Sequence, residues 1–302
     1  MRTLRVLLVY LAFVFIGAAL LSPLLYKLVH SLSNTYPWLE GLREQPFHRY
    51  VNRCMLLLAL LGMWPFLQRI GIDFSRPAES SRSTWATLFA RGLSIGLASL
   101  LFIGLIELGV GARVLHPERT ASQLLAAAFS GLLTALVVSL IEETLFRKGL
   151  FVALQKEMPL VYAALLSSLV YALVHFFHRP ASPAQIEWTS GFATLAGMLK
   201  GFAHFRDFVP AFFNLTFAGM ILAIYYARKG SLAISIGIHA GWIFWLKFWG
   251  VLTDNVQGIS VWIWGSSRLI DGWLAFAVLA AMLSWIMSKR PTKRPIPESH
   301  AI

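Results

Sequence analysis

The chain has 302 residues, of which 57% are hydrophobic and only 13% are charged. A soluble domain of this size needs more charge at its surface, so the composition excludes an ordinary soluble protein. The formal net charge is +12, but the basic residues are spread through short loops and the tail. Such loop cations orient membrane proteins and contact anionic lipid, so we expect membrane lipid as a partner and no nucleic acid.

The apolar residues form runs of about twenty, the length that spans the hydrocarbon core of a bilayer. The sequence therefore predicts an all-α fold, a polytopic transmembrane bundle of about eight membrane helices. In chain order the predicted spans are 5–26, 54–70, 89–110, 124–146, 160–178, 209–227, 231–251 and 271–288. The second run is short, which indicates a tilted or partly re-entrant segment.

The same pattern divides the chain into four parts. Residues 1–115 hold the N-terminal membrane helices and a linker, and 120–252 form the core that carries the unusual residues described below. Residues 253–288 add a loop and a last membrane helix, and 289–302 form a basic, proline-rich tail that we expect to be disordered. The distribution of basic residues favours a multi-pass protein of the cytoplasmic (inner) membrane with both termini inside.

Two adjacent glutamates, Glu142 and Glu143, interrupt the fourth predicted span. An ionisable group inside a span costs about 2.5–3.5 kcal/mol, so such residues mark function by default. Neighbouring side chains on a helix point about 100° apart, so one carboxylate can face a cavity while the other pairs with a neighbour. Arg147 follows Glu143 by four residues, which permits an intrahelical ion pair. The alternative is that both acids simply mark a cytoplasmic helix end.

Two histidines lie in later spans, His175 in the fifth and His239 in the seventh. If a hairpin turns at Pro159, the helical rise places the glutamates about 23 Å before the turn and His175 about 25 Å after it. We therefore expect acid and imidazole to meet inside the membrane. His239 precedes the small residues Ala240 and Gly241, which permit close helix approach. The alternative for either histidine is a hydrogen bond between helices and nothing more.

The segment Gly92-Leu-Ser94-Ile-Gly96 matches the G-x-S-x-G pattern of serine hydrolases. It lacks the strand–turn–helix context of a nucleophile elbow, and small residues produce it by chance in membrane helices. The sequence contains no His-Glu-x-x-His motif and no pair of intramembrane aspartates. We therefore do not expect a serine, zincin-type or aspartyl mechanism.

The order Glu142-Glu143-x-x-x-Arg147, then Tyr171-x-x-x-His175, then His239 resembles the CPBP family. This family comprises the type II CAAX prenyl endopeptidases and their bacteriocin-processing and self-immunity relatives. The resemblance covers about residues 123–250 and implies an intramembrane endopeptidase. The catalytic residues that it implies here are Glu142, Glu143, His175 and His239, with Arg147 and Tyr171 in support.

On this resemblance, Glu142 is the general base that activates water for attack on a peptide carbonyl. His175 would orient that water or protonate the leaving amine, and His239 would stabilise the oxyanion. Glu143 with Arg147 would hold the helix and tune the local field. We expect no cofactor, and the alternative is a zinc ion held by Glu142, His175 and His239. The expected partner is a peptide or protein substrate at the membrane.

Two positions depart from the family pattern. Tyr171 stands where phenylalanine is usual, and Ile243 stands where the third motif usually has asparagine or aspartate. That polar residue is thought to help stabilise the oxyanion, so the donor here is absent or comes from elsewhere, with Asn214, Tyr171 and Trp242 as candidates. Two other functions therefore stay open: a catalytically impaired scaffold or immunity protein of the same fold, and a proton-coupled transporter.

Overall fold

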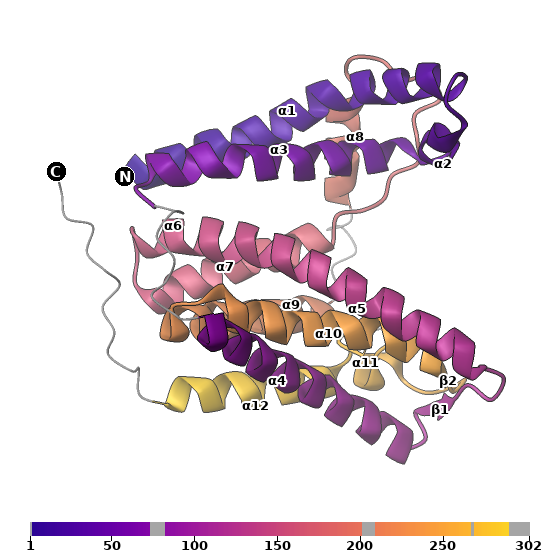
Figure 1. The fold of residues 1–302 in the computed structure, drawn as a ribbon, viewed down its shortest axis with the longest axis vertical. Helices are drawn as coiled ribbons and strands as arrows, with labels where there is room; N and C mark the ends of the chain where they lie inside the picture. The colour runs from indigo at the N-terminus through magenta and orange to yellow at the C-terminus, as the bar shows by residue number, and fades with distance from the viewer. Residues whose placement is uncertain (1, 73–81, 201–208, 267–268, 290–302) are drawn as a thin grey trace. The chain divides into compact units, whose positions relative to one another are not determined.

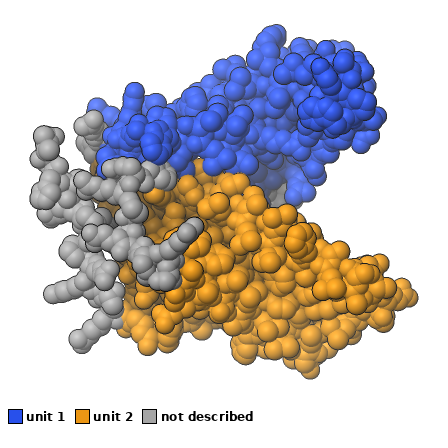
Figure 2. Space-filling model, viewed as in Figure 1, with its two compact units in different colours: residues 1–73, 174–205 blue, residues 74–173, 206–302 orange. Residues whose placement is uncertain are grey.

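The computed structural model describes residues 2–72, 82–200, 209–266 and 269–289, and within these ranges the chain is almost entirely helical (Figure 1). It divides into two compact units, coloured separately in Figure 2. Unit 1 comprises Met1–Asp73 and Val174–Phe205, and unit 2 comprises Phe74–Leu173 and Arg206–Ile302. Apart from Lys289, the predicted disordered tail lies outside the described residues, as does most of the predicted linker between the second and third spans.

The predicted all-α membrane bundle is confirmed, since a helix coincides with each of the eight predicted spans. In the described ranges, six helical segments are long and apolar enough to cross a membrane: Thr3–Ser33, Phe47–Arg69, Trp85–Gly109, Ala121–Gln155, Val209–Lys229 and Leu232–Leu252. The other two are α7 (Leu160–His175) and α12 (Trp273–Ser288), each of 16 residues. At 1.5 Å per residue each is about 24 Å long, short of a hydrocarbon core of roughly 30 Å.

In unit 1, α1 (Arg2–Ser33) packs along α3 (Phe47–Arg69), and α8 (Ser190–Leu199) packs against both. Two short elements, η1 (Pro37–Leu39) and α2 (Glu40–Arg43), connect the long pair. The predicted span 54–70 begins earlier than expected, at Phe47, and the resulting 23-residue helix is long enough to cross a membrane without a re-entrant segment. The sequence hides this start because polar and charged residues interrupt the apolar run just after it.

In unit 2, α10 (Leu232–Leu252) is the central helix and packs against α4 (Arg82–Gly109), α5 (Ala121–Glu143) and α9 (Val209–Lys229). Every residue of α10 from Ala233 to Trp242 is buried. The short strands β1 (Arg113–Leu115) and β2 (Thr253–Asn255) pair antiparallel where α4 and α10 end, and α11 (Val261–Trp264) precedes α12. His239 therefore lies in the most enclosed part of this unit.

Four glycines bring the backbones of α4 and α10 into contact. A Cβ atom on Gly96 would lie 2.2 Å from the carbonyl oxygen of Ile238. Cβ atoms on Gly92, Gly237 and Gly241 would lie 2.2, 2.3 and 2.6 Å from backbone atoms of the facing helix. Two small-x-x-x-small pairs thus face each other, the arrangement that lets membrane helices approach closely. The close approach fixes the position of α10, and with it that of His239.

Replacing Gly96 by alanine is expected to lower the free energy of unfolding by about 1–3 kcal/mol, because backbone atoms cannot yield to the added methyl group. Gly109→Ala on the same helix is the matched control, since no atom lies within 4 Å of a Cβ there. Thermal unfolding of the two variants in detergent measures the difference. Equal stability of the two would contradict the tight contact between α4 and α10.

A buried polar cluster closes unit 2 where α10 ends. The guanidinium of Arg113 donates hydrogen bonds to the Thr253 hydroxyl and carbonyl oxygens, the Asn255 side chain and the Ser266 carbonyl oxygen. Its Nε atom lies 3.9 Å from a carboxylate oxygen of Glu107, which is fully buried in α4. No motif in the sequence marks Glu107, although it lies inside a predicted span.

Arg113→Met is expected to destabilise the protein by about 3–5 kcal/mol, because it leaves the buried Glu107 carboxylate without a counter-charge. The double variant Glu107→Gln/Arg113→Met removes both charges and is expected to recover part of that loss. The free energies of unfolding of the wild-type protein, Glu107→Gln, Arg113→Met and the double variant form a double-mutant cycle that measures the coupling of the two residues. A double variant that is less stable than Arg113→Met would refute the pairing.

Candidate active site

The two glutamates lie where the fourth span changes its helical form. α5 ends at Glu143, and the chain continues without a break as a π-helix, η2 (Thr144–Phe151), and then as α6 (Val152–Gln155). A π-helix forms i→i+5 hydrogen bonds and occurs frequently at functional sites. The chain turns into α7 after Pro159, where the sequence predicts the hairpin turn.

Glu143 is fully buried and contacts two basic side chains. One carboxylate oxygen lies 3.3 Å from Nε of Arg147, which is also fully buried, so the expected intrahelical ion pair is present. The other oxygen lies 3.0 Å from Nδ1 of His239. An ionised carboxylate can only accept a hydrogen bond, so Nδ1 is the donor. Glu143 therefore links the α5–η2 helix to α10.

Glu142 occupies a different environment from its neighbour. Its side chain is 23% exposed, whereas that of Glu143 is not exposed at all. One carboxylate oxygen of Glu142 lies 3.7 Å from Nε2 of His239. The two carboxylates thus face different surroundings, as their angular separation on a helix predicts. Glu143 is paired in the interior, and Glu142 is accessible.

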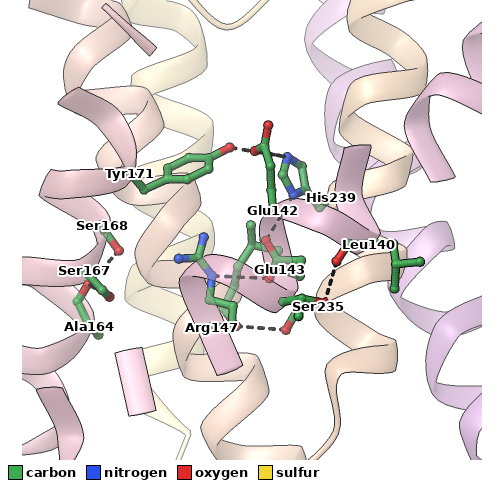
Figure 3. A network of polar contacts seen from close by, with 12 residues as sticks. Leu140, Glu142, Glu143, Arg147, Ala164, Ser167, Ser168, Tyr171, Ser235 and His239 are labelled. Atoms are coloured by element: carbon green, nitrogen blue, oxygen red, sulfur yellow. Dashed lines mark hydrogen bonds and ion pairs between the residues drawn. The ribbon is translucent and has the colours of Figure 1, made fainter. Parts of the chain in front are cut away.

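Tyr171 joins the cluster from α7 (Figure 3). Its hydroxyl donates a hydrogen bond to the Glu142 carboxylate and lies 3.3 Å from Nε2 of His239. The tyrosine ring packs edge-on to the imidazole, and the Arg147 guanidinium lies 5.1 Å from the ring centroid. Two glutamates, a histidine, a tyrosine and an arginine from three helical segments therefore form one network.

His175 is the last residue of α7, one helical turn beyond Tyr171, and it falls within unit 1. Its part in the site stays a prediction. Within unit 2, the side chain of α7 that contacts the glutamates is that of Tyr171. The sequence carried a signal for this contact, a hydroxyl at a position where the family usually has phenylalanine.

Two of the three candidate donors for the oxyanion are engaged elsewhere. The Asn214 amide donates to two carbonyl oxygens of the segment before α12, at 2.8 and 2.9 Å. The Trp242 indole donates to the Ser99 hydroxyl at 2.8 Å, which links α10 to α4. Of the three, Tyr171 is the one whose polar atom contacts Glu142 and His239.

Ser94 belongs to a segment of α4 that packs against α10. Its hydroxyl donates to the Ala90 carbonyl oxygen at 3.0 Å, one turn earlier on α4. The flanking residues Gly92 and Gly96 contact the backbone of α10. The G-x-S-x-G pattern is therefore a helix-packing motif in this fold.

The zinc alternative requires three ligands, and two of them, Glu142 and His239, lie together with 3.7 Å between their nearest polar atoms. Nε2 of His239 is the nitrogen available to an ion, since Nδ1 faces Glu143. Over the described ranges, no group of three or more His, Cys, Asp or Glu side chains is arranged to hold a metal ion. The third proposed ligand, His175, belongs to unit 1.

Fold and site together define a class of protein: an integral membrane protein in which an accessible carboxylate borders a buried acid–imidazole–arginine network. Residues 124–245, which are 122 of the 302, match the family described as Type II CAAX prenyl endopeptidase Rce1-like. The match confirms the expected resemblance of this segment to that protease family, and the segment contains all six predicted site residues. No curated protein and no solved structure matches the chain.

Proposed function

We propose that the protein is an intramembrane endopeptidase that hydrolyses a peptide bond of a membrane-associated peptide or protein. The observation that carries this proposal is the environment of Glu142, a 23% exposed carboxylate that contacts Tyr171 and His239 within a bundle of apolar helices. From Leu232, where α10 begins, to His239 is seven residues, or about 10 Å. On this proposal a substrate enters only that far, from the end of the bundle where α10 begins, and water enters from the same end.

In this mechanism Glu142 is the general base. It takes one proton from a water molecule whose oxygen attacks the peptide carbonyl carbon, and it returns that proton to the departing amine. The products are a new carboxyl terminus, which carries one oxygen atom from water, and a new amino terminus. His175 orients the water or relays that proton from Glu142 to the amine, the role that the family resemblance implies.

His239 and Tyr171 stabilise the negative charge that develops on the carbonyl oxygen. Glu143 accepts the Nδ1 hydrogen bond and so holds the imidazole with Nε2 toward Glu142. When both ring nitrogens carry a proton, Nε2 donates to the oxyanion. The Tyr171 hydroxyl, whose hydrogen bond to Glu142 is released once that carboxylate is protonated, supplies the second donor. Groups already held in place in a site of low dielectric stabilise a transition state strongly, because little reorganisation is needed.

Tyr171→Phe is expected to lower kcat by about 10²-fold, because it removes one oxyanion donor and keeps the ring that packs against His239. KM is expected to change little, since the hydroxyl acts mainly in the transition state. Tyr162→Phe is the matched control, because Tyr162 lies on the same helix and is 65% exposed. If Tyr171→Phe cleaved at the wild-type rate, the second oxyanion donor would have to be another group.

We favour the metal-free form of this chemistry over the form in which Glu142, His175 and His239 bind zinc. The metal-free form predicts that dialysis against a chelator leaves the cleavage rate of the purified protein unchanged. Elemental analysis of the same sample is expected to find no stoichiometric zinc. Loss of activity on chelation, restored by added zinc, would assign the ion to the site instead.

A further inference from the structure

A groove of about 680 Å³ lies in unit 2 between α4, α9 and α10, and none of its lining residues belongs to the catalytic network. One face of α4 forms a wall, because its five lining residues recur at intervals of three and four. Residues near the end of α9 form the opposite wall, and α10 contributes one residue near its start. The lining residues are Thr87, Ala90, Arg91, Ser94, Ile95, Tyr225, Lys229 and Ile234.

Two cations in this groove have no acidic partner among the residues that the structure describes. Arg91 and Lys229 are both exposed, and neither forms an ion pair with another residue that the structure describes. The adjacent Arg228 differs, because its guanidinium donates to two carbonyl oxygens at the end of α12, at 2.7 and 2.9 Å. Arg91 and Lys229 are therefore available to an anionic ligand, whereas Arg228 serves to connect two helices.

The polarity of the groove changes with depth. The glycine contacts show that α4 and α10 run in the same direction, so the start of both helices and the end of α9 lie at one end of the unit. Lys229 is the last residue of α9, and Tyr225 lies one turn deeper. On α4, Ile95 lies one turn deeper than Arg91. The groove thus has both cations nearer this end, with the side chain of Ile95 and the ring of Tyr225 below them, an order that matches the headgroup and acyl chain of an anionic phospholipid.

We infer that this groove binds the phosphate headgroup of an anionic phospholipid, with an acyl chain along its deeper part. Basic pockets between transmembrane helices are established binding sites for anionic headgroups. The planar guanidinium of Arg91 can form two parallel hydrogen bonds to a phosphate, and Lys229 adds a second positive charge. The inference does not depend on the peptidase mechanism, since the two sites share no residue.

Native mass spectrometry of the full chain, purified in detergent and titrated with phosphatidylglycerol or phosphatidylcholine, tests this site. Phosphatidylglycerol is expected to bind more tightly than phosphatidylcholine. Arg91→Gln/Lys229→Gln is expected to weaken phosphatidylglycerol binding by about tenfold or more, as the loss of two headgroup contacts predicts. The matched control Arg119→Gln/Lys247→Gln removes the same charge from exposed positions outside the groove and is expected to keep wild-type affinity.

A second variant separates loss of charge from loss of fold. Arg91→Lys/Lys229→Arg keeps both charges and is expected to retain phosphatidylglycerol. Wild-type affinity in the double glutamine variant, or equal affinity for the two lipids, would overturn the inference. Complete displacement of the lipid by inorganic phosphate would assign the groove to free phosphate and would also overturn the lipid assignment.

Discussion

Glu142→Gln is expected to slow peptide cleavage by about 10³-fold, because glutamine keeps the shape of the side chain but cannot take a proton from water. Both the metal-free and the zinc forms of the mechanism need this carboxylate, so the expected loss is common to them. The residue is partly exposed, and the free energy of unfolding is expected to change by less than about 1 kcal/mol. Purified protein in proteoliposomes, assayed on a panel of membrane-tethered peptides, provides the rate.

The matched control for this variant is Glu157→Gln, which removes an exposed carboxylate from the turn before α7. It is expected to cleave at the wild-type rate. Retained cleavage in Glu142→Gln would contradict the proposed base. A Glu142→Gln protein that lacks cleavage but still confers the wild-type phenotype in cells would favour the scaffold function that Ile243 suggests.

Arg147→Met is expected to have a large effect on stability, a loss of about 3–5 kcal/mol, because it leaves the buried Glu143 carboxylate without its ion-pair partner. The side chain of Arg147 is fully enclosed, and within the described part of the chain its guanidinium nitrogens have no hydrogen-bond partner. Its stabilising contribution therefore comes from the charge of Glu143 and the ring of Tyr171. Activity is expected to fall as well, since Glu143 orients His239.

Chemical unfolding in detergent measures this loss, with Arg119→Met as the control at an exposed position. The double variant Glu143→Gln/Arg147→Met is expected to be more stable than Arg147→Met alone, because it no longer buries an unpaired charge. If Arg147→Met were as stable as the exposed control, the ion pair would have no structural role.

The membrane fold could be predicted from sequence because a run of about twenty apolar residues has few alternatives to a spanning helix. The errors lie where polar residues interrupt a run. The start of α3 at Phe47 is hidden by the basic residues that follow it, and α7 ends at His175, earlier than its apolar run suggests. In both cases composition alone does not reveal where a helix begins or ends.

Within the site, local contacts were predictable and long-range contacts were not. The Glu143–Arg147 pair follows from helical spacing. The hydrogen bond from His239 to Glu143 joins residues 96 positions apart and depends on how α10 packs, which no local pattern specifies. The π-helix η2 has more residues per turn than an α-helix, so it also changes which residues of the α5–α7 hairpin lie at the same height. A period of 3.6 residues does not anticipate this shift.

The glycines of α4 are a further case in which a local sequence pattern does not specify a long-range contact. The pattern Gly92-x-Ser94-x-Gly96 permits two interpretations, a nucleophile motif and a helix-packing motif. The contacts of the two glycines with α10 decide in favour of packing. The sequence contains the matching pair, Gly237 and Gly241, but pairing it with α4 requires knowledge of which helices are neighbours.

The central claim is that the network around Glu142 hydrolyses peptide bonds with water from the membrane interface. The most direct test is to incubate membranes in H₂¹⁸O with purified wild-type or Glu142→Gln protein, and to identify the new carboxyl termini by mass spectrometry. The mechanism predicts new termini that carry one ¹⁸O atom with the wild-type protein and none with the variant. The same set of labelled termini from both proteins would contradict it.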